Sequence, residues 1–324
     1  MSRVHNFSAG PAALPLEVLE TIRNDLPDWL GSGMSVMEVS HRGADFVELA
    51  ARAEATLRDL LHVPDDYSVL FPQGGATMQM AMAPMNLSAP GDAADYVVTG
   101  SWGKKAAGEA KKFCDVNVVA DASDKKFTYI PDESSWQRSD NAAYLHYTPN
   151  ETIAGVEFHF VPGGDVPLVA DMSSNILSRP IDVSRFGAIY AGAQKNIGPA
   201  GITLVIVRDE LLDRARADNP HLMTWKSYAD SGSMTNTPPT FAWYVADLVF
   251  QWLKRQGGVE AMAEVNDRKS GKLYAAIDAS DFYSNPVAKD CRSRMNVPFI
   301  LADDALDKKF LEESAAAGLA NLKG

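Results

Sequence analysis

Short apolar runs that alternate with amphipathic segments are the feature that most constrains the fold of this chain. Apolar residues recur at helical spacing in the segments between the runs. Short apolar strands interleaved with helices are typical of an α/β fold, in which a mostly parallel sheet is covered by helices on both faces. The runs expected to be buried strands are 67–70, 96–98, 116–119, 143–146, 168–170, 188–191 and 202–207.

The expected helices divide the chain into two parts. Gly257 and Gly258 stop the helix at 241–256, as glycines at helix C-termini do. We expect residues 16–257 to form a large domain and residues 258–324 a smaller C-terminal α/β domain. The helices expected in the large domain are 16–26, 46–61, 76–85, 103–112 and 241–256, and the elements expected after it are a helix at 259–277, a strand at 295–301 and a helix at 306–317.

Composition excludes several classes of protein. The 324 residues carry a formal net charge of −12, which disfavours binding to nucleic acid or to anionic membranes. Two cysteines without a Cys-x-x-Cys pair, and six histidines without ligand spacing, predict neither a disulfide framework nor a metal site. The first residues lack the apolar core of a signal peptide, and no apolar run approaches ~20 residues. A cytoplasmic protein is the expectation.

Lys195 is the strongest candidate for a catalytic residue. It follows the apolar run at 188–191 and precedes a glycine-rich exit, Gly198 to Gly201. Burying an ammonium is costly and lowers its pKa, and a lysine with a lowered pKa is suited to form a Schiff base with an aldehyde cofactor. The alternative is an ordinary surface lysine in a loop.

Asp171 is the expected partner of Lys195. It ends the apolar run that begins at Leu168, and ligands bind at the carboxyl ends of strands in open α/β sheets. The 24 positions between the two residues are enough for one strand–crossover–strand unit, so both side chains could emerge at neighbouring strand ends. An acid there could hold the proton of a pyridinium ring. Alternatively, Asp171 caps the turn at Ser173 and Ser174.

Two further segments suit a phosphorylated aromatic cofactor. Gly74 and Gly75 lie between a strand and a helix, where backbone N–H groups can bind a phosphate. Trp102 lies at another such turn and could stack on a flat ring. A turn without a ligand and a tryptophan of the core are the respective alternatives.

His41 and Arg42 form a candidate site for an anionic substrate. Arginine binds carboxylate or phosphate with two parallel N–H groups, and histidine adds a donor. The alternative is a helix-start ion pair with Asp45 or Glu48.

With these residues in view, the chain resembles the phosphoserine aminotransferases, which are class-V, fold-type I enzymes that use pyridoxal phosphate. The most specific segments are Ser-Val-Met-Glu-Val-Ser-His-Arg at 35–42, Tyr-Ala-Gly-Ala-Gln-Lys-Asn-Ile-Gly-Pro at 190–199 and Asn-Thr-Pro-Pro-Thr at 236–240. Residues 6–11 and 292–297 also match. The resemblance implies the fold-type I architecture, with residues 1–15 associated with the small domain.

The resemblance also implies how the cofactor is bound. Lys195 forms the Schiff base and carries the proton, and Asp171 pairs with the pyridine nitrogen. Trp102 stacks on the ring, and Thr152 forms a hydrogen bond with the ring hydroxyl. The residues implied to bind the cofactor phosphate are Ala76, Thr77 and Gln194, together with Asn236 and Thr237 of the neighbouring subunit.

A homodimer follows from that last assignment. His41 and Arg42 match residues that bind the phosphate of phosphoserine or the distal carboxylate of glutamate. The implied reaction transfers an amino group between glutamate and 3-phosphohydroxypyruvate in serine biosynthesis, and in some members also serves pyridoxine biosynthesis.

In the family the chain continues beyond the position of Gly324. The additional strand and helix carry an arginine that binds the substrate α-carboxylate and a His-Arg pair that helps to bind the phosphate. Relative to the family, the small domain is therefore expected to be truncated. The alternatives are a cofactor-binding remnant with little transaminase activity and another class-V enzyme that uses pyridoxal phosphate.

Overall fold

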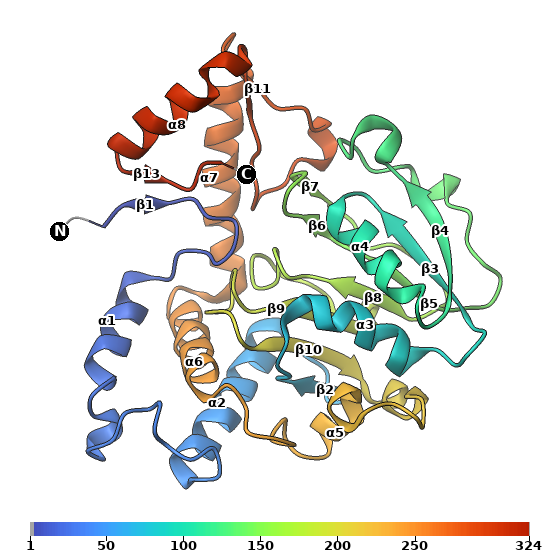
Figure 1. Ribbon diagram of the computed structural model, residues 1–324, viewed down its shortest axis with the longest axis vertical. Coiled ribbons are helices and arrows are strands. Elements are labelled where there is room, and N and C mark those ends of the chain that lie inside the picture. The colour runs from blue at the N-terminus through green and yellow to red at the C-terminus, as the bar shows by residue number, and fades with distance from the viewer. Residues whose placement is uncertain (1–2, 324) are drawn as a thin grey trace.

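A seven-stranded sheet lies at the centre of the computed structural model, which describes residues 3–323 (Figure 1). Neighbouring strands from β9 to β4 are parallel, whereas β10 is antiparallel to both β9 and β2. The predicted mostly parallel α/β sheet is therefore confirmed. In spatial order the strands are β2 (Tyr67–Leu70), β10 (Thr203–Arg208), β9 (Ala188–Gly192), β8 (Leu168–Asp171), β5 (Ala142–Tyr147), β3 (Ala93–Val98) and β4 (Asp115–Asp121).

The helices cover this sheet from both sides. Each expected helix is present, with ends that differ by a few residues from those predicted. No helix within residues 3–323 is long and apolar enough to cross a membrane. The helices are α1 (Leu16–Asp25), α2 (Ala44–Leu61), α3 (Gly75–Leu87), α4 (Ser101–Ala110), α5 (Trp225–Ala229), α6 (Thr240–Arg255), α7 (Gly258–Asp278) and α8 (Asp307–Ala316).

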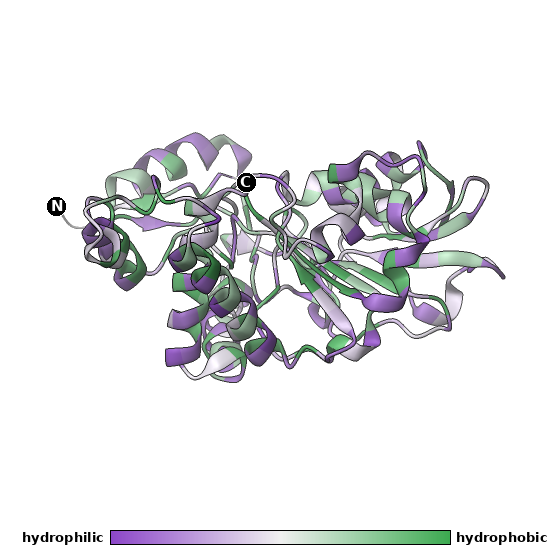
Figure 2. Cartoon of the chain, turned by 90° about the horizontal axis from the view of Figure 1, so that it is seen from below, coloured by the Kyte–Doolittle hydropathy of each residue, from purple (hydrophilic) through white to green (hydrophobic). Residues whose placement is uncertain are grey.

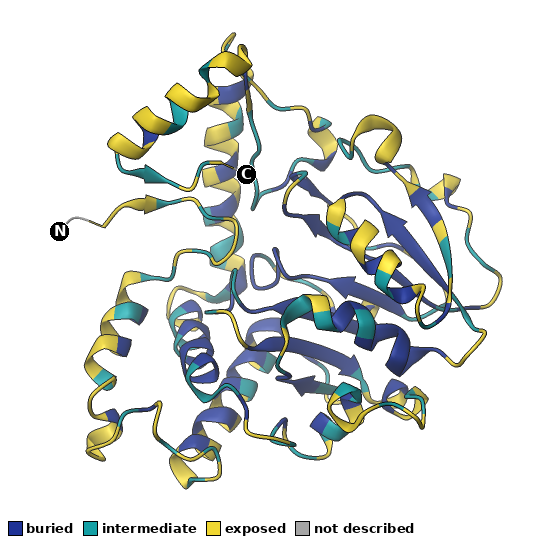
Figure 3. Cartoon of the chain, viewed as in Figure 1, coloured by how far each residue is buried: buried dark blue, intermediate teal, exposed yellow. Residues whose placement is uncertain are grey.

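Two hydrophobic cores result, one on each face of the sheet. Successive side chains of a strand point to opposite faces, so Ile189 and Ala191 of β9 enter one core and Ala188 and Tyr190 enter the other. The first core contains side chains of α2 and α6, and the second contains side chains of α3, α4 and α5. Hydrophobic residues are accordingly concentrated in the strands (Figure 2), which are buried, while α1 and α8 expose much of their surface (Figure 3).

The two ends of the described chain lie side by side. β1 (His5–Asn6) pairs in parallel with β13 (Leu319–Ala320). Gly257 adopts a φ of +97°, which ends α6 and lets α7 begin at once. The domain boundaries at residues 15 and 257 stay a prediction, and residues 1, 2 and 324 of the predicted domains lie outside the described part.

The predicted strand at 295–301 is wrong over most of its length. Only Ile300–Leu301 is a strand (β12), which pairs with β11 (Tyr283–Ser284). The N–H groups of Met295 and Asn296 donate instead to the Ser293 hydroxyl, at 3.0 and 2.9 Å. Because a side chain satisfies these donors, the segment does not need a neighbouring strand.

Candidate active site

The structure places Asp171 and Lys195 at the same edge of the sheet. Asp171 is the last residue of β8, and Lys195 follows the end of the neighbouring parallel strand β9. The carboxyl ends of parallel strands meet at one edge, as expected from the sequence. Asp171 is only 4% exposed, and Lys195 is half-buried.

The Lys195 amine is held by two of the other predicted residues. Its Nζ donates to Thr152 Oγ1 at 2.6 Å and lies 5.7 Å from the centre of the Trp102 ring. Burial lowers the pKa of Lys195, although the negative charges of Asp171 and Glu151 oppose this shift. Lys195 is therefore not the exposed surface lysine of the alternative interpretation.

One oxygen of the Asp171 carboxylate accepts hydrogen bonds from the turn that follows it. Oδ1 accepts from the backbone N–H and the hydroxyl of Ser173, at 3.0 and 2.6 Å, and that hydroxyl in turn accepts from Gly192 N–H at 3.0 Å. The turn-capping alternative is thus correct as far as Ser173 is concerned. Oδ2 has no hydrogen-bond partner within the described residues, and burial raises the pKa of the group. One oxygen therefore remains to accept from a cationic N–H group.

Glu151 is a member of the site that the sequence did not reveal. It belongs to β6 (Asn150–Glu151), is fully buried, and accepts from the N–H groups of Trp102 and Gly103 at 3.0 and 2.7 Å. Burial raises its pKa to about 7. Glu151 fixes the start of α4, and its neighbour Thr152 holds Lys195. We call Lys195, Asp171, Glu151, Thr152 and Trp102 the Lys195 cluster.

The glycine turn begins α3 close to this cluster. Gly74 and Gly75 have φ angles of +97° and +68°, which L side chains rarely adopt. Ala76 and Thr77 follow in the first turn of α3, and no side chain caps its N–H groups. Lys105 of α4 donates to Thr77 Oγ1 at 3.1 Å and lies 5.5 Å from the centre of the Trp102 ring. Lys105 thus connects the glycine turn to the Lys195 cluster.

The remaining residues predicted to bind the cofactor phosphate are Gln194, Asn236 and Thr237. Gln194 precedes Lys195, and its carbonyl oxygen accepts from Ala12 N–H at 2.8 Å. The carbonyl oxygen of Thr237 accepts from Gln73 Nε2 at 2.7 Å, immediately before the glycine turn. Asn236 and Thr237 are exposed.

Within residues 3–323, no hydrogen bond or ion pair joins His41 or Arg42 to the Lys195 cluster. They lie in the turn before α2, where the Arg42 N–H donates to Ser40 Oγ at 3.2 Å. No ion pair joins Arg42 to an acid within the described residues, so the alternative of a helix-start ion pair is also not observed.

A second charged cluster surrounds Glu157, at the end of β7 (Val156–Glu157). Glu157 is fully buried and lies 3.4 Å from Arg179 Nε and 3.2 Å from Arg294 Nη2. Arg294 also donates to His159 Nδ1 at 2.9 Å. We call these four residues the Glu157 cluster.

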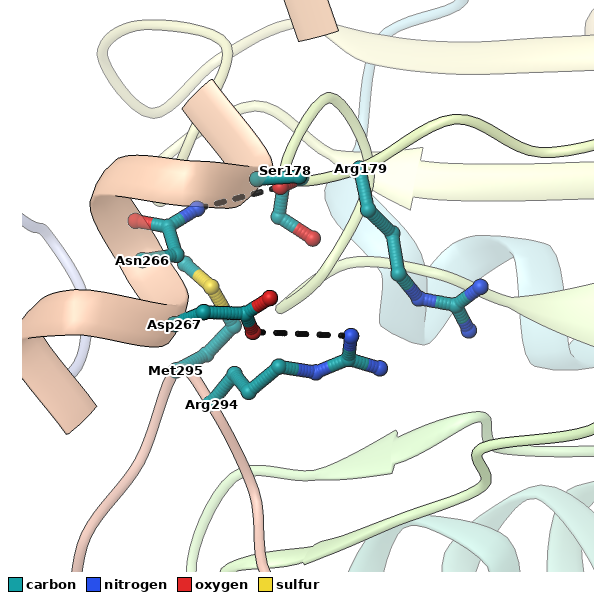
Figure 4. Close-up of a pocket in the computed structure, with 7 residues that line it drawn as sticks. Ser178, Arg179, Asn266, Asp267, Arg294 and Met295 are labelled. Atoms are coloured by element: carbon teal, nitrogen blue, oxygen red, sulfur yellow. Dashed lines mark hydrogen bonds and ion pairs between the residues drawn. The ribbon is translucent and has the colours of Figure 1, made fainter. Parts of the chain in front are cut away.

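Figure 4 shows the small pocket beside the Glu157 cluster, with Arg179 and Arg294 on its wall and Asp267 3.7 Å from Arg294 Nη1. On the same wall Asn266 donates to the carbonyl oxygen of Ser178 at 3.1 Å. No group of three or more potential metal ligands occurs among residues 3–323.

The comparisons with known proteins agree with this geometry. The family described as Aminotransferase class-V matches residues 4–320. The phosphoserine aminotransferase of Hahella chejuensis is 58% identical over 99% of this chain and 90% of its own, and that of Pseudomonas aeruginosa PAO1 is 57% identical with the same coverage.

Solved structures show the same relationship. The phosphoserine aminotransferase of Bacillus circulans subsp. alkalophilus has 47% identity and a TM-score of 0.97, covering 99% of this chain and 90% of its own. The pyridoxal-phosphate-bound enzyme of Trichomonas vaginalis has 41% identity and a TM-score of 0.95, covering 99% and 92%. The chain therefore belongs to the class-V aminotransferases and, within them, to the phosphoserine aminotransferases, which confirms the resemblance found in the sequence.

The residues of the Lys195 cluster fit pyridoxal phosphate. Trp102 Nε1 is buried without a partner among the described residues, and Asp171 has a free carboxylate oxygen. An amine with a lowered pKa, an acid, an aromatic face and a hydroxyl form the donor set that a phosphorylated pyridine aldehyde needs. Pyridoxal phosphate is the cofactor of this chain.

Proposed function

We propose that the chain transfers the amino group of glutamate to 3-phosphohydroxypyruvate, which yields O-phosphoserine and 2-oxoglutarate. The observation that carries the proposal is the lysine–aspartate pair at adjacent strand ends, in a chain 57–58% identical to phosphoserine aminotransferases. That similarity favours this reaction over another class-V chemistry.

The positions of the residues support the following roles. Pyridoxal phosphate, when bound, supplies an aldehyde and an electron-accepting ring. Lys195 would hold the aldehyde, and its amine would act as the base that takes the proton from the substrate Cα and returns it. Burial lowers its pKa, which favours the uncharged amine that both tasks need. Asp171 Oδ2 would hold the proton at the ring nitrogen.

The neighbouring residues orient the ring and exclude water. Trp102 offers its face to the ring, and Thr152 offers a hydroxyl beside Lys195. A Cβ on Gly10 would lie 3.3 Å from Lys195 Cε, so the N-terminal segment covers the lysine closely. Ala76, Thr77 and Gln194 are proposed to bind the cofactor phosphate.

We further propose that the protein works as a homodimer, in which Asn236 and Thr237 reach the neighbouring subunit's cofactor and His41 and Arg42 bind the substrate anion. Arg42, Asn236 and Thr237 are exposed and His41 is half-buried. Within the described residues no hydrogen bond or ion pair joins any of the four to the Lys195 cluster, which supports this assignment. Large exposed apolar side chains also gather in the first 47 residues, which supports a covered face there. They are Val4, Phe7, Leu16, Leu26, Leu30, Met34, Met37 and Val47.

The cytoplasm is the proposed location, because Cys114 and Cys291 are both free and buried.

We also propose two domains, on the basis of the helix stop at Gly257 and Gly258 and of the family resemblance. The large domain consists of residues 16–257, and the small domain consists of residues 1–15 and 258–324. The pairing of β1 with β13 supports that division.

One spectroscopic experiment tests the reaction. The absorbance band of bound pyridoxal phosphate should bleach when glutamate is added, and 3-phosphohydroxypyruvate should then restore it. A band that glutamate leaves unchanged would favour the cofactor-binding remnant. Bleaching that 3-phosphohydroxypyruvate does not reverse would favour another aminotransferase substrate.

A further inference from the structure

The residues proposed to bind the cofactor phosphate have no positive charge among them. Ala76, Thr77, Gln194, Asn236 and Thr237 are all neutral. A phosphate monoester carries a charge of about −1.5 to −2 at pH 7, and taking it out of water requires compensation by hydrogen bonds and positive charge. The first turn of α3 supplies N–H groups and the positive end of the helix dipole, but no full charge.

Lys105 is the cation that the structure places at this turn. Its Nζ lies 3.1 Å from Thr77 Oγ1 and 5.5 Å from the centre of the Trp102 ring. It therefore lies between the first turn of α3 and the ring proposed to stack on the cofactor.

The positive charge of Lys105 is not neutralised by an acidic side chain of the described residues. Glu109, four residues further along α4, is the usual type of partner for a helical lysine, yet it pairs with Lys112 at 2.6 Å. No ion pair within residues 3–323 includes Lys105. The first turn of α3 also contains no acidic residue that could compete with an anion.

We infer that Lys105 binds the phosphate of pyridoxal phosphate as its counter-charge at the first turn of α3. The inference rests on the proposed cofactor site and adds to it a residue from a different helix. An ammonium near the phosphate would strengthen binding by charge as well as by hydrogen bonding. Because Lys105 is exposed, its contribution should weaken at high salt.

A set of three variants tests the inference. Holoenzyme of the wild type and of Lys105→Gln, Lys105→Arg and Lys104→Gln is dialysed to equilibrium against graded pyridoxal phosphate, or against pyridoxal, which lacks the phosphate. Bound cofactor is read from absorbance. Lys104 is the matched control, because it is the adjacent exposed lysine of α4 and no described residue pairs with it.

Lys105→Gln should bind pyridoxal phosphate about tenfold more weakly, which corresponds to about 1.4 kcal/mol, and should bind pyridoxal as the wild type does. Lys105→Arg should recover most of the affinity, and Lys104→Gln should change neither ligand. The preference of the wild type for pyridoxal phosphate should fall with salt more steeply than that of Lys105→Gln.

Three outcomes would overturn the inference in distinguishable ways. Equal loss of both ligands in Lys105→Gln would show that Lys105 only supports Thr77 or the helix, and no loss of either ligand would show that Lys105 does not bind the phosphate. In both cases the proposed function stands if glutamate still bleaches the wild-type band. A wild type that does not prefer pyridoxal phosphate over pyridoxal would contradict the proposed cofactor site as well.

Discussion

Two fully buried glutamates lie in one β-hairpin and have opposite surroundings. Glu157 on β7 lies beside the guanidinium groups of Arg179 and Arg294. Glu151 on β6 accepts from two backbone N–H groups and has no ion-pair partner among the described residues. Burial of a charge is costly unless it is paired, so the two positions differ in how that cost is offset.

The difference distinguishes a cluster that stabilises the structure from a cluster that is arranged for catalysis. In the Glu157 cluster, one carboxylate is paired with two guanidinium groups from distant parts of the chain. In the Lys195 cluster, burial raises the pKa of Asp171 and Glu151 and lowers that of Lys195. Each of these groups is shifted toward its neutral form, as is common where a site is arranged for proton transfer.

Replacing Lys195 by alanine should have the largest effect. Transamination should fall at least about 10³-fold, because general-base catalysis alone contributes about 10²–10⁴-fold and the covalent attachment is lost as well. Thermal unfolding of the variant without cofactor should occur at or above the wild-type temperature, because a desolvated ammonium is removed. Lys104→Ala serves as the control. Unfolding at a clearly lower temperature would mean that Lys195 has a structural role.

Glu151→Gln should change how stability depends on pH. A folded-state pKa of about 7, above that of the unfolded chain, means that the folded protein binds the proton more tightly. This group therefore makes stability fall as pH rises from about 4.5 to about 7, by at most about 3–4 kcal/mol. Urea denaturation at several pH values should show a shallower fall for Glu151→Gln. The exposed Glu312→Gln is the control, and identical profiles for all three proteins would contradict the burial argument.

Gly100→Ala tests the space that Glu151 occupies. A Cβ at Gly100 would lie 2.3 Å from Glu151 Cδ, although its φ of −178° suits any residue. We expect a loss of about 1–3 kcal/mol, the usual range for overpacking. A Cβ at Gly108, inside α4, would have no atom within 4 Å, so Gly108→Ala should stabilise by about 0.5–1 kcal/mol.

The double variant Gly100→Ala with Glu151→Ala makes this test sharper. Since the clash is with Glu151 itself, the combined loss should be smaller than the sum of the two single losses. Strict additivity would show that Gly100 and Glu151 do not interact.

Arg294→Met should have the smallest effect, and only on stability. Removing one partner of a buried ion pair costs about 3–5 kcal/mol, but Glu157 keeps Arg179 and Arg294 is 26% exposed, so about 1–2 kcal/mol is expected. Affinity for pyridoxal phosphate should stay unchanged. Lys289→Met, which disrupts an exposed pair with Asp278, should cost less than about 1 kcal/mol. A loss of cofactor affinity in Arg294→Met would remove the distinction between the two clusters.

The sequence predicted the parts of the molecule that depend on local patterns. Asp171 and Lys195 each follow an apolar run, and parallel strands bring the ends of such runs to one edge. The glycines at 74 and 75 indicated a turn because positive φ angles favour glycine. These signals lie within a few residues of the feature that they predict.

Features that depend on distant parts of the chain were missed. Glu151 binds N–H groups about 50 positions earlier, and Lys105 reaches Thr77 from another helix. The predicted strand at 295–301 failed for a local reason, because the side chain of Ser293 satisfies its first N–H groups. The resemblance to a family predicted a set of cofactor residues, but it named neither Glu151 nor Lys105.

The central claim is that the amine of Lys195, opposite Asp171, holds the cofactor. Reduction of the holoenzyme with borohydride, followed by proteolysis and mass spectrometry of the peptides, tests it most directly. The account predicts that the cofactor mass is attached to Lys195 alone, in the wild type and in Lys105→Gln. Attachment to Lys105 or to any other lysine, or no attachment at all, would contradict it.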